Sequence, residues 1–67
     1  MIHRIQVLLT ERRNLLREKH ALKCEMDYAV DPIRYLECRG RLGFIRDRCD
    51  IIMEQIRRGV DEIAAQT

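Results

Sequence analysis

Apolar residues recur at heptad spacing through the second half of this chain, and this spacing constrains the fold more than any other feature. Positions a are Tyr35, Leu42, Cys49, Ile56 and Ile63, and positions d are Cys38, Ile45, Ile52 and Gly59. All of them except Gly59 are apolar. A seam that continues over four heptads predicts one long helix packed along another helix. Met53 and Val60 add apolar residues at position e.

The only proline, Pro32, divides the chain near its middle. The residue before a proline is disfavoured in helical conformation, whereas proline is favoured at the first position of a helix and Asp is a good N-cap. The run Val30-Asp31-Pro32 therefore predicts one helix over about residues 2–29 and another over about 32–64. Because the connection is short, we expect an antiparallel two-helix hairpin; a single kinked helix is the alternative.

The first half of the chain carries a wider apolar stripe. Its d positions are Leu8, Leu15, Leu22 and Ala29, and its e positions are Ile2, Leu9, Leu16, Lys23 and Val30. Position a is less apolar, because it holds Arg12 and Lys19 besides Ile5 and Met26. We therefore expect this helix to pack through a line between d and e. Such a wide stripe suits a helical bundle better than a two-helix zipper.

Two glycines, Gly40 and Gly43, interrupt the second predicted helix. Each costs about 1 kcal/mol relative to Ala inside a helix, so the pair could mark a break into three helices. The heptad nevertheless stays in phase through Cys38, Leu42 and Ile45, and a loop would be expected to shift it. We therefore expect a continuous helix with a bend or a close backbone approach at the glycines.

A chain of 67 residues forms one domain, residues 1–67. Two helices of about 28 residues are rods roughly 40 Å long that touch along one line, so a lone hairpin is expected to be marginally stable. We expect either a dimer of hairpins that forms a four-helix bundle or docking on a larger protein assembly. The predicted oligomer seam consists of Leu8, Leu15, Leu22, Leu42, Ile45, Cys49, Ile52, Ile56 and Ile63.

The sequence offers little for catalysis. It contains no Ser, no glycine-rich phosphate loop and no Cys-x-x-Cys. We expect no catalytic, cofactor-binding or metal-binding residues and no small-molecule substrate; a metal site of His20, Cys24 and Cys38 is conceivable but not favoured. Three cysteines cannot all pair within one chain, so reduced thiols in the cytoplasm are expected. No apolar run approaches the roughly 20 residues of a membrane span.

Basic residues gather in the middle of the predicted hairpin, although the net charge is only +2. The predicted basic belt consists of Arg12, Arg13, Arg17, Lys19, Lys23, Arg39, Arg41, Arg46 and Arg48. Such a belt could bind phosphates or an acidic protein surface. The candidate nucleic-acid contacts are Arg13, Arg17, Arg39 and Arg46. Alternatively, these cations point in different directions and some pair locally, for instance with Glu11 and Glu18.

A second candidate surface lies away from the heptad seam. Phe44 and Ile51 are seven residues apart with Arg48 between them. This spacing is typical of a helix that presents anchors to a partner, and scattered surface hydrophobes are the alternative. We predict Phe44, Arg48 and Ile51 as partner-binding residues. Tyr28 and Tyr35 flank the turn and are expected to pack over it.

These features predict an all-α, non-enzymatic protein–protein interaction module that acts as a small accessory, regulatory or assembly subunit. The expected partner is the chain itself, as a homodimer, or a larger protein assembly, with no membrane. Nucleic-acid binding by a hairpin dimer, chiefly to RNA, is the alternative function. Short length, Met1 and the lack of a targeting signal suggest a bacterial or phage protein, located in the cytoplasm or a virion.

Overall fold

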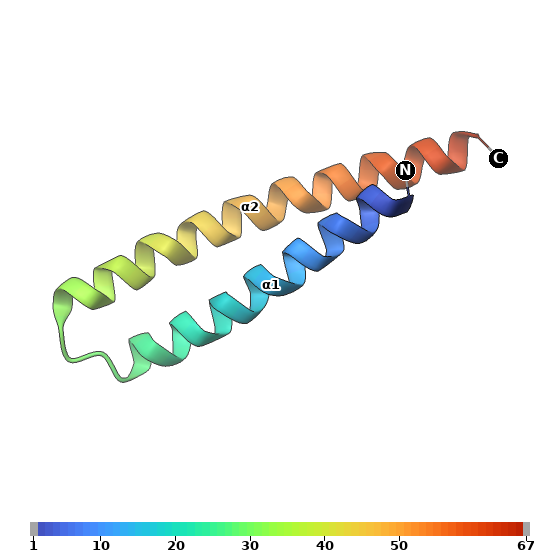
Figure 1. Cartoon of the computed structure of the whole chain (residues 1–67). Helices are drawn as coiled ribbons and strands as arrows, with labels where there is room; N and C mark the ends of the chain where they lie inside the picture. The colour runs from blue at the N-terminus through green and yellow to red at the C-terminus, as the bar shows by residue number, and fades with distance from the viewer. Residues whose placement is uncertain (1, 67) are drawn as a thin grey trace.

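The computed structural model is an antiparallel helical hairpin, and it describes residues 2–66. Helix α1 spans Ile2–Asp27 and helix α2 spans Pro32–Ala65. The two helices lie side by side, so that both ends of the chain are at the same end of a rod of 55 × 15 × 12 Å (Figure 1). This arrangement confirms the predicted hairpin. Neither helix, within the described residues, is long and apolar enough to cross a membrane.

The start of α2 is set by the residues around the proline. The Asp31 carboxylate accepts a hydrogen bond from the backbone N–H of Ile33 at 3.0 Å, and Pro32 occupies the first turn. This N-cap satisfies a backbone donor that the helix itself cannot pair. Helix α1 ends two residues earlier than predicted, in a tightened turn where Ala29 N–H donates to the Met26 carbonyl at 3.3 Å.

The early end of α1 changes the surroundings of the turn. Tyr28 lies beyond the helix and 85% of it is exposed, while Tyr35 is 42% exposed. The prediction that both tyrosines pack over the turn is therefore wrong for Tyr28, which is no longer held on a helical face that meets α2. Val30, predicted to continue the apolar stripe, is 96% exposed for the same reason.

The core is a single line of side chains between the two helices. In α2 the buried residues are Cys38, Ile45, Ile52 and Gly59, which are the predicted d positions. In α1 the buried residue is Leu8, also at position d. The other predicted seam residues, Leu15, Leu22, Leu42, Cys49, Ile56 and Ile63, are half-buried. The hairpin itself therefore covers much of this seam.

Helix α1 does not pack through a line between d and e. Its e residues Ile2 and Leu9 are 65% and 44% exposed, whereas Arg12 and Lys19 at position a are half-buried. The helix instead packs through a and d. Long Arg and Lys side chains can lay their methylene stems over apolar surface while their charges reach water, so a cation at position a need not be turned away from the seam.

Helix α2 continues through both glycines, as the unbroken heptad phase predicts. The predicted close backbone approach is absent: a Cβ atom added to Gly40 or Gly43 would meet no atom within 4 Å outside the local helix. The d residues Cys38 and Ile45 on either side of the glycines are both buried. Packing at these positions holds the segment helical despite the low helix propensity of glycine.

Truncation of the core should be far more destabilising than truncation of an exposed apolar residue. Ile45 is fully buried and Ile51 is 50% exposed. We expect Ile45→Ala to lower the free energy of unfolding by about 2–5 kcal/mol. The matched Ile51→Ala change should lower it by less than about 1 kcal/mol. Urea unfolding followed by helical circular dichroism measures both, and equal losses would contradict the single-line core.

Candidate functional site

One flank of the hairpin is closed by ion pairs between the helices. Three arginines of α2 each donate two hydrogen bonds to the carboxylate of one glutamate of α1. The pairs are Arg34–Glu25, Arg41–Glu18 and Arg48–Glu11. In that order, the arginine Nη2 atom lies 2.9, 2.9 and 3.3 Å from a glutamate oxygen. We call these six residues the closed flank.

The closed flank repeats with the heptad on both helices. Its members are seven residues apart in α1 and in α2, and their order is reversed as an antiparallel pair requires. In each pair the hydrogen bond from the guanidinium holds the pKa of the glutamate below its ordinary value of 4.5. The side chains are about 36–47% exposed, so each pair alone contributes little stability. All three pairs form together only in the observed register, which they therefore favour.

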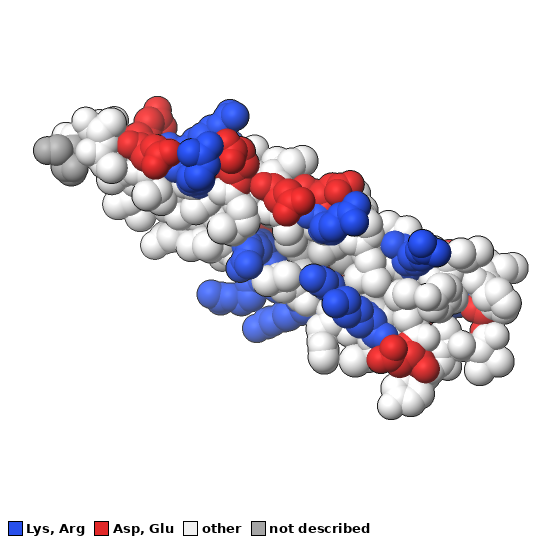
Figure 2. Space-filling model, turned by 180° about the vertical axis from the view of Figure 1, so that it is seen from behind, with Lys and Arg blue, Asp and Glu red and all other residues white. Residues whose placement is uncertain are grey.

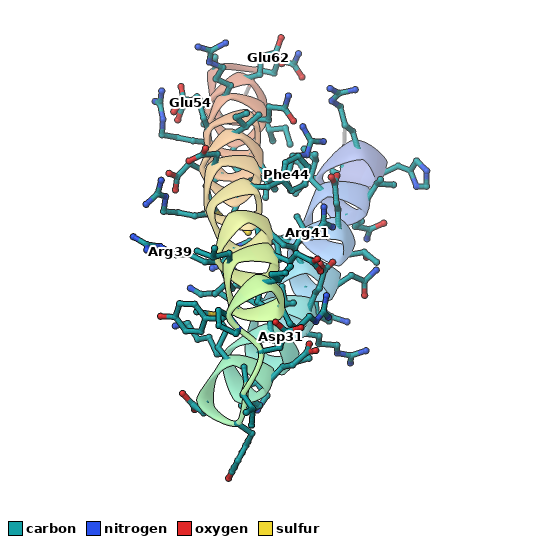
Figure 3. All side chains as sticks on the ribbon, turned by 90° about the vertical axis from the view of Figure 1, so that its left-hand side faces the viewer. Asp31, Arg39, Arg41, Phe44, Glu54 and Glu62 are labelled. Carbon is teal, nitrogen blue, oxygen red and sulfur yellow. The ribbon has the colours of Figure 1, made fainter. Side chains whose placement is uncertain are left out.

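The predicted partner-binding residues lie on this side of α2. Phe44 and Ile51 are 53% and 50% exposed, whereas Arg48 is partly buried in its pair with Glu11. The Arg41 guanidinium lies 4.6 Å from the centre of the Phe44 ring, a cation–π contact. Figure 3 shows Phe44 and Arg41 on the same side of α2. The structure thus leaves Phe44 and Ile51 accessible but engages Arg48 within the hairpin.

The opposite flank has no such closure among the described residues. A groove of about 410 Å³ runs between the helices there, lined by Lys19, Lys23, Arg39, Leu42, Gly43 and Arg46. Figure 3 shows Arg39 leaving α2 on the side opposite to Arg41. The groove residues continue at heptad spacing into two rows, Leu9, Leu16 and Lys23 on α1, and Arg39, Arg46, Met53 and Val60 on α2. We call the groove and these rows the open flank.

The open flank has two halves of different character. Toward the chain ends, Leu9, Met53 and Val60 are 44%, 46% and 50% exposed. Toward the turn, the same rows continue as Lys23, Arg39 and Arg46, and both walls of the groove are basic. Sequence reasoning did not single out Leu9, Met53 or Val60 as site residues, although their seven-residue spacing from the basic residues was the available signal.

The predicted basic belt is divided between the two flanks. Arg41 and Arg48 belong to the closed flank, as the alternative of local pairing with Glu18 and Glu11 anticipated. Arg12, Arg13 and Arg17 line a further hollow on α1, next to Leu9 and Leu16. The four predicted nucleic-acid contacts, Arg13, Arg17, Arg39 and Arg46, therefore line the hollow and the groove. In Figure 2, blue side chains gather over the middle of the rod, on the α1 side, and a red group lies at one end of them.

Most cations of the predicted basic belt have no acidic residue paired with them among the described residues. Within residues 2–66, six of them form no ion pair: Arg12, Arg13, Arg17, Lys19, Lys23 and Arg39. Arg46 contacts its neighbour Asp47 at 3.4 Å, and both side chains are at least 70% exposed. Three of the four groove cations therefore form no ion pair within the described hairpin.

The thiols do not form a metal site. Cys24 Sγ lies 3.7 Å from His20 Nε2, but Cys38 is buried in the core of the hairpin. The described part of the chain contains no group of three residues able to hold a metal ion. Burial raises the pKa of the Cys38 thiol, which suits a packing residue rather than a reactive one.

No protein-family model, curated protein or solved structure matches this chain. The surface of the hairpin is therefore the basis on which a function can be inferred.

Acid should weaken the hairpin through the closed flank. Because Arg hydrogen bonds lower the pKa of Glu11, Glu18 and Glu25 in the folded state, their contribution is complete above 4.5 and is lost as the pH falls through the folded-state values. We expect the urea midpoint to fall as the pH drops from about 6 to about 3. A variant with Gln at all three positions should show a flatter decrease, and an unchanged decrease would contradict this role.

One substitution should add a fourth Arg–Glu pair to the closed flank. Arg4 and Gln55 lie one heptad beyond Glu11 and Arg48 and line the same hollow. We expect Gln55→Glu to add an ion pair with Arg4 and to raise the free energy of unfolding by up to about 1 kcal/mol, less at high salt. Gln55→Lys should lower it. Thermal unfolding at two salt concentrations measures both, and a stabilising Gln55→Lys would contradict the register.

Proposed function

We propose that this hairpin is a non-enzymatic protein–protein interaction module, a small accessory, regulatory or assembly subunit that binds through the open flank. The observation that carries this proposal is the difference between the two flanks. On the closed flank, every arginine of the heptad row is satisfied by a glutamate of the other helix. On the open flank, half-exposed apolar residues and unpaired cations lie together.

The small size of the core supports the same proposal. Four large or medium side chains are buried among the described residues, namely Leu8, Cys38, Ile45 and Ile52. A single line of buried residues leaves much apolar surface in water, and covering Leu9, Met53 and Val60 would be favourable by about 25 cal/mol per Å² of apolar area. Pairing of two hairpins into a four-helix bundle and docking on a larger protein are both ways of covering this surface.

The open flank is a better candidate than the predicted patch of Phe44, Arg48 and Ile51. Arg48 already donates hydrogen bonds to Glu11, and Arg41 lies over the Phe44 ring. A partner at the patch would have to compete with these contacts. A partner at the open flank would displace no described ion pair between the helices.

Nucleic-acid binding is the second candidate function. It is favoured by the clustering of Arg13, Arg17, Arg39 and Arg46 with further cations along the hollow and the groove. Binding of this kind would fall steeply as the salt concentration rises, and Ala at these positions would weaken it broadly. We further propose a reducing, cytoplasm-like compartment, because the three cysteines are unpaired thiols.

Site-specific photo-crosslinking tests the proposed surface. Benzoylphenylalanine replaces Met53 on the open flank or, as a matched control, Phe44 on the opposite side; the two positions are 46% and 53% exposed. In cells that produce the protein, we expect a protein adduct from position 53 and little from position 44. Adding Leu9→Asp should remove the adduct at position 53 while the helical circular dichroism persists.

The other crosslinking results would either move the binding surface or contradict the proposed function. An adduct from position 44 alone would move the binding surface to the predicted patch. An adduct that nuclease digestion removes would favour the nucleic-acid function. The absence of any adduct from both positions would contradict an interaction module.

A further inference from the structure

We infer that the open flank receives an amphipathic helix of a different protein, whose apolar half covers Leu9 and Met53 and whose carboxylates lie against the groove of Lys23, Arg39 and Arg46. This inference rests on the proposed interaction function and adds the chemistry of the partner. It follows from the charges of the groove, from the apolar half beside it and from the symmetry that a second copy would impose.

All the charged residues that line the groove are basic, so a negatively charged ligand would be favoured there. Lys19 and Lys23 on α1 face Arg39 and Arg46 on α2 across it, with no acidic residue in its lining. On the closed flank the same two helices place a glutamate opposite every arginine, so the fold readily supports opposite charges at this spacing. Carboxylates brought by a partner would pair with these cations, and Arg is well suited to bind carboxylates through two hydrogen bonds.

The apolar half indicates a protein rather than a nucleic acid. Leu9, Met53 and Val60 continue the rows that hold the groove cations, and each is about half exposed. A phosphate backbone would leave these side chains in water. Bases that stack need aromatic side chains, but no aromatic residue lines the groove, and Phe44 lies on the opposite side of α2. A helix with an apolar and an acidic half would cover both parts of the flank.

A second copy of the chain fits this flank poorly. If two hairpins met face to face with their turns at the same end, the basic half of one would oppose the basic half of the other. With their turns at opposite ends, the middle of α1 would meet the middle of the second α1, where Arg12, Arg13 and Arg17 lie. Both two-fold arrangements therefore bring like charges together in a region of reduced dielectric.

The flank also sets the dimensions of the partner. From Leu9 to Lys23 the row on α1 covers two heptads, or about 21 Å at 1.5 Å per residue. A partner helix of about four turns matches this length. Gly43 lines the groove, and a Cβ atom added there would meet no atom within 4 Å outside the local helix. A longer side chain at this position would be tolerated by the fold but would occupy the groove.

Synthetic helical peptides test the inference directly. Fluorescent peptides of about 18 residues carry Leu on one half of a single face and Glu on the other half, in either chain direction. Matched peptides carry Gln or Lys in place of Glu. Fluorescence anisotropy with the full chain should show tighter binding of one Glu peptide than of its Gln counterpart, by about tenfold or more, with a difference that shrinks at high salt.

Variants of the chain locate the binding site. Arg39→Glu with Arg46→Glu should abolish binding of the Glu peptide while the helical circular dichroism persists, because the groove then holds two carboxylates beside its two lysines and has lost its net positive charge. Arg57→Glu with Arg58→Glu makes the same charge change at residues engaged with Glu54 and should leave peptide binding within about twofold. Gly43→Leu should weaken binding, whereas Gly40→Leu, which lies outside the groove lining, should not.

Three other results would each contradict the inference of an acidic helical partner in a different way. Equal binding of the Glu and Gln peptides, or binding of neither, would overturn the acidic partner but not the interaction module, which depends on the crosslink from position 53. Tighter binding of an RNA oligomer of similar length, lost in the Arg39→Glu and Arg46→Glu variant, would assign the groove to nucleic acid. A mass of twice 8.0 kDa by light scattering, reduced to one chain by Met53→Asp, would assign the flank to a second copy.

Discussion

The antiparallel register of the two helices is the constraint on which the rest of this structure depends. A line of apolar residues drives the helices together, but hydrophobic burial is not directional and would tolerate a shift along the rod. The three Arg–Glu pairs favour the observed alignment, because all three form only in this register and a shift of one heptad would leave two of them. Their value lies in specificity more than in stability, since exposed ion pairs contribute little free energy.

Once the register is fixed, the character of the two flanks follows. Glutamates of α1 and arginines of α2 pair on the closed flank, and the remaining cations of the middle of the rod, except Arg46, have no acidic partner among the described residues. The same alignment brings Lys23 opposite Arg39 in the groove. The closed flank pairs its charges and the groove does not, and this contrast is the basis of our proposal that another molecule covers the groove.

Much of the fold could be predicted from the sequence because it depends on local chemistry. The Asp31-Pro32 pair sets the start of α2, and the d residues Ile45 and Ile52 are buried as their spacing predicts. The end of α1 and the exposure of Tyr28 could not be predicted in the same way, because no single residue signals where that helix ends. The predicted packing line of α1 is wrong because a cation such as Arg12 can lie at the seam, which its long aliphatic stem covers. The two flanks appear only when the rows of both helices are aligned.

The turn between the helices has a consequence for how the chain can assemble. Every pair of the closed flank joins α1 to α2, so two chains that exchanged their second helices would keep each pair and the same buried d residues. Contacts along the rod therefore do not distinguish the closed hairpin from a domain-swapped dimer. That distinction falls to residues 28–31, where the Asp31 cap holds the chain in a bend. These four residues thus decide whether both helices of a rod come from one chain or from two.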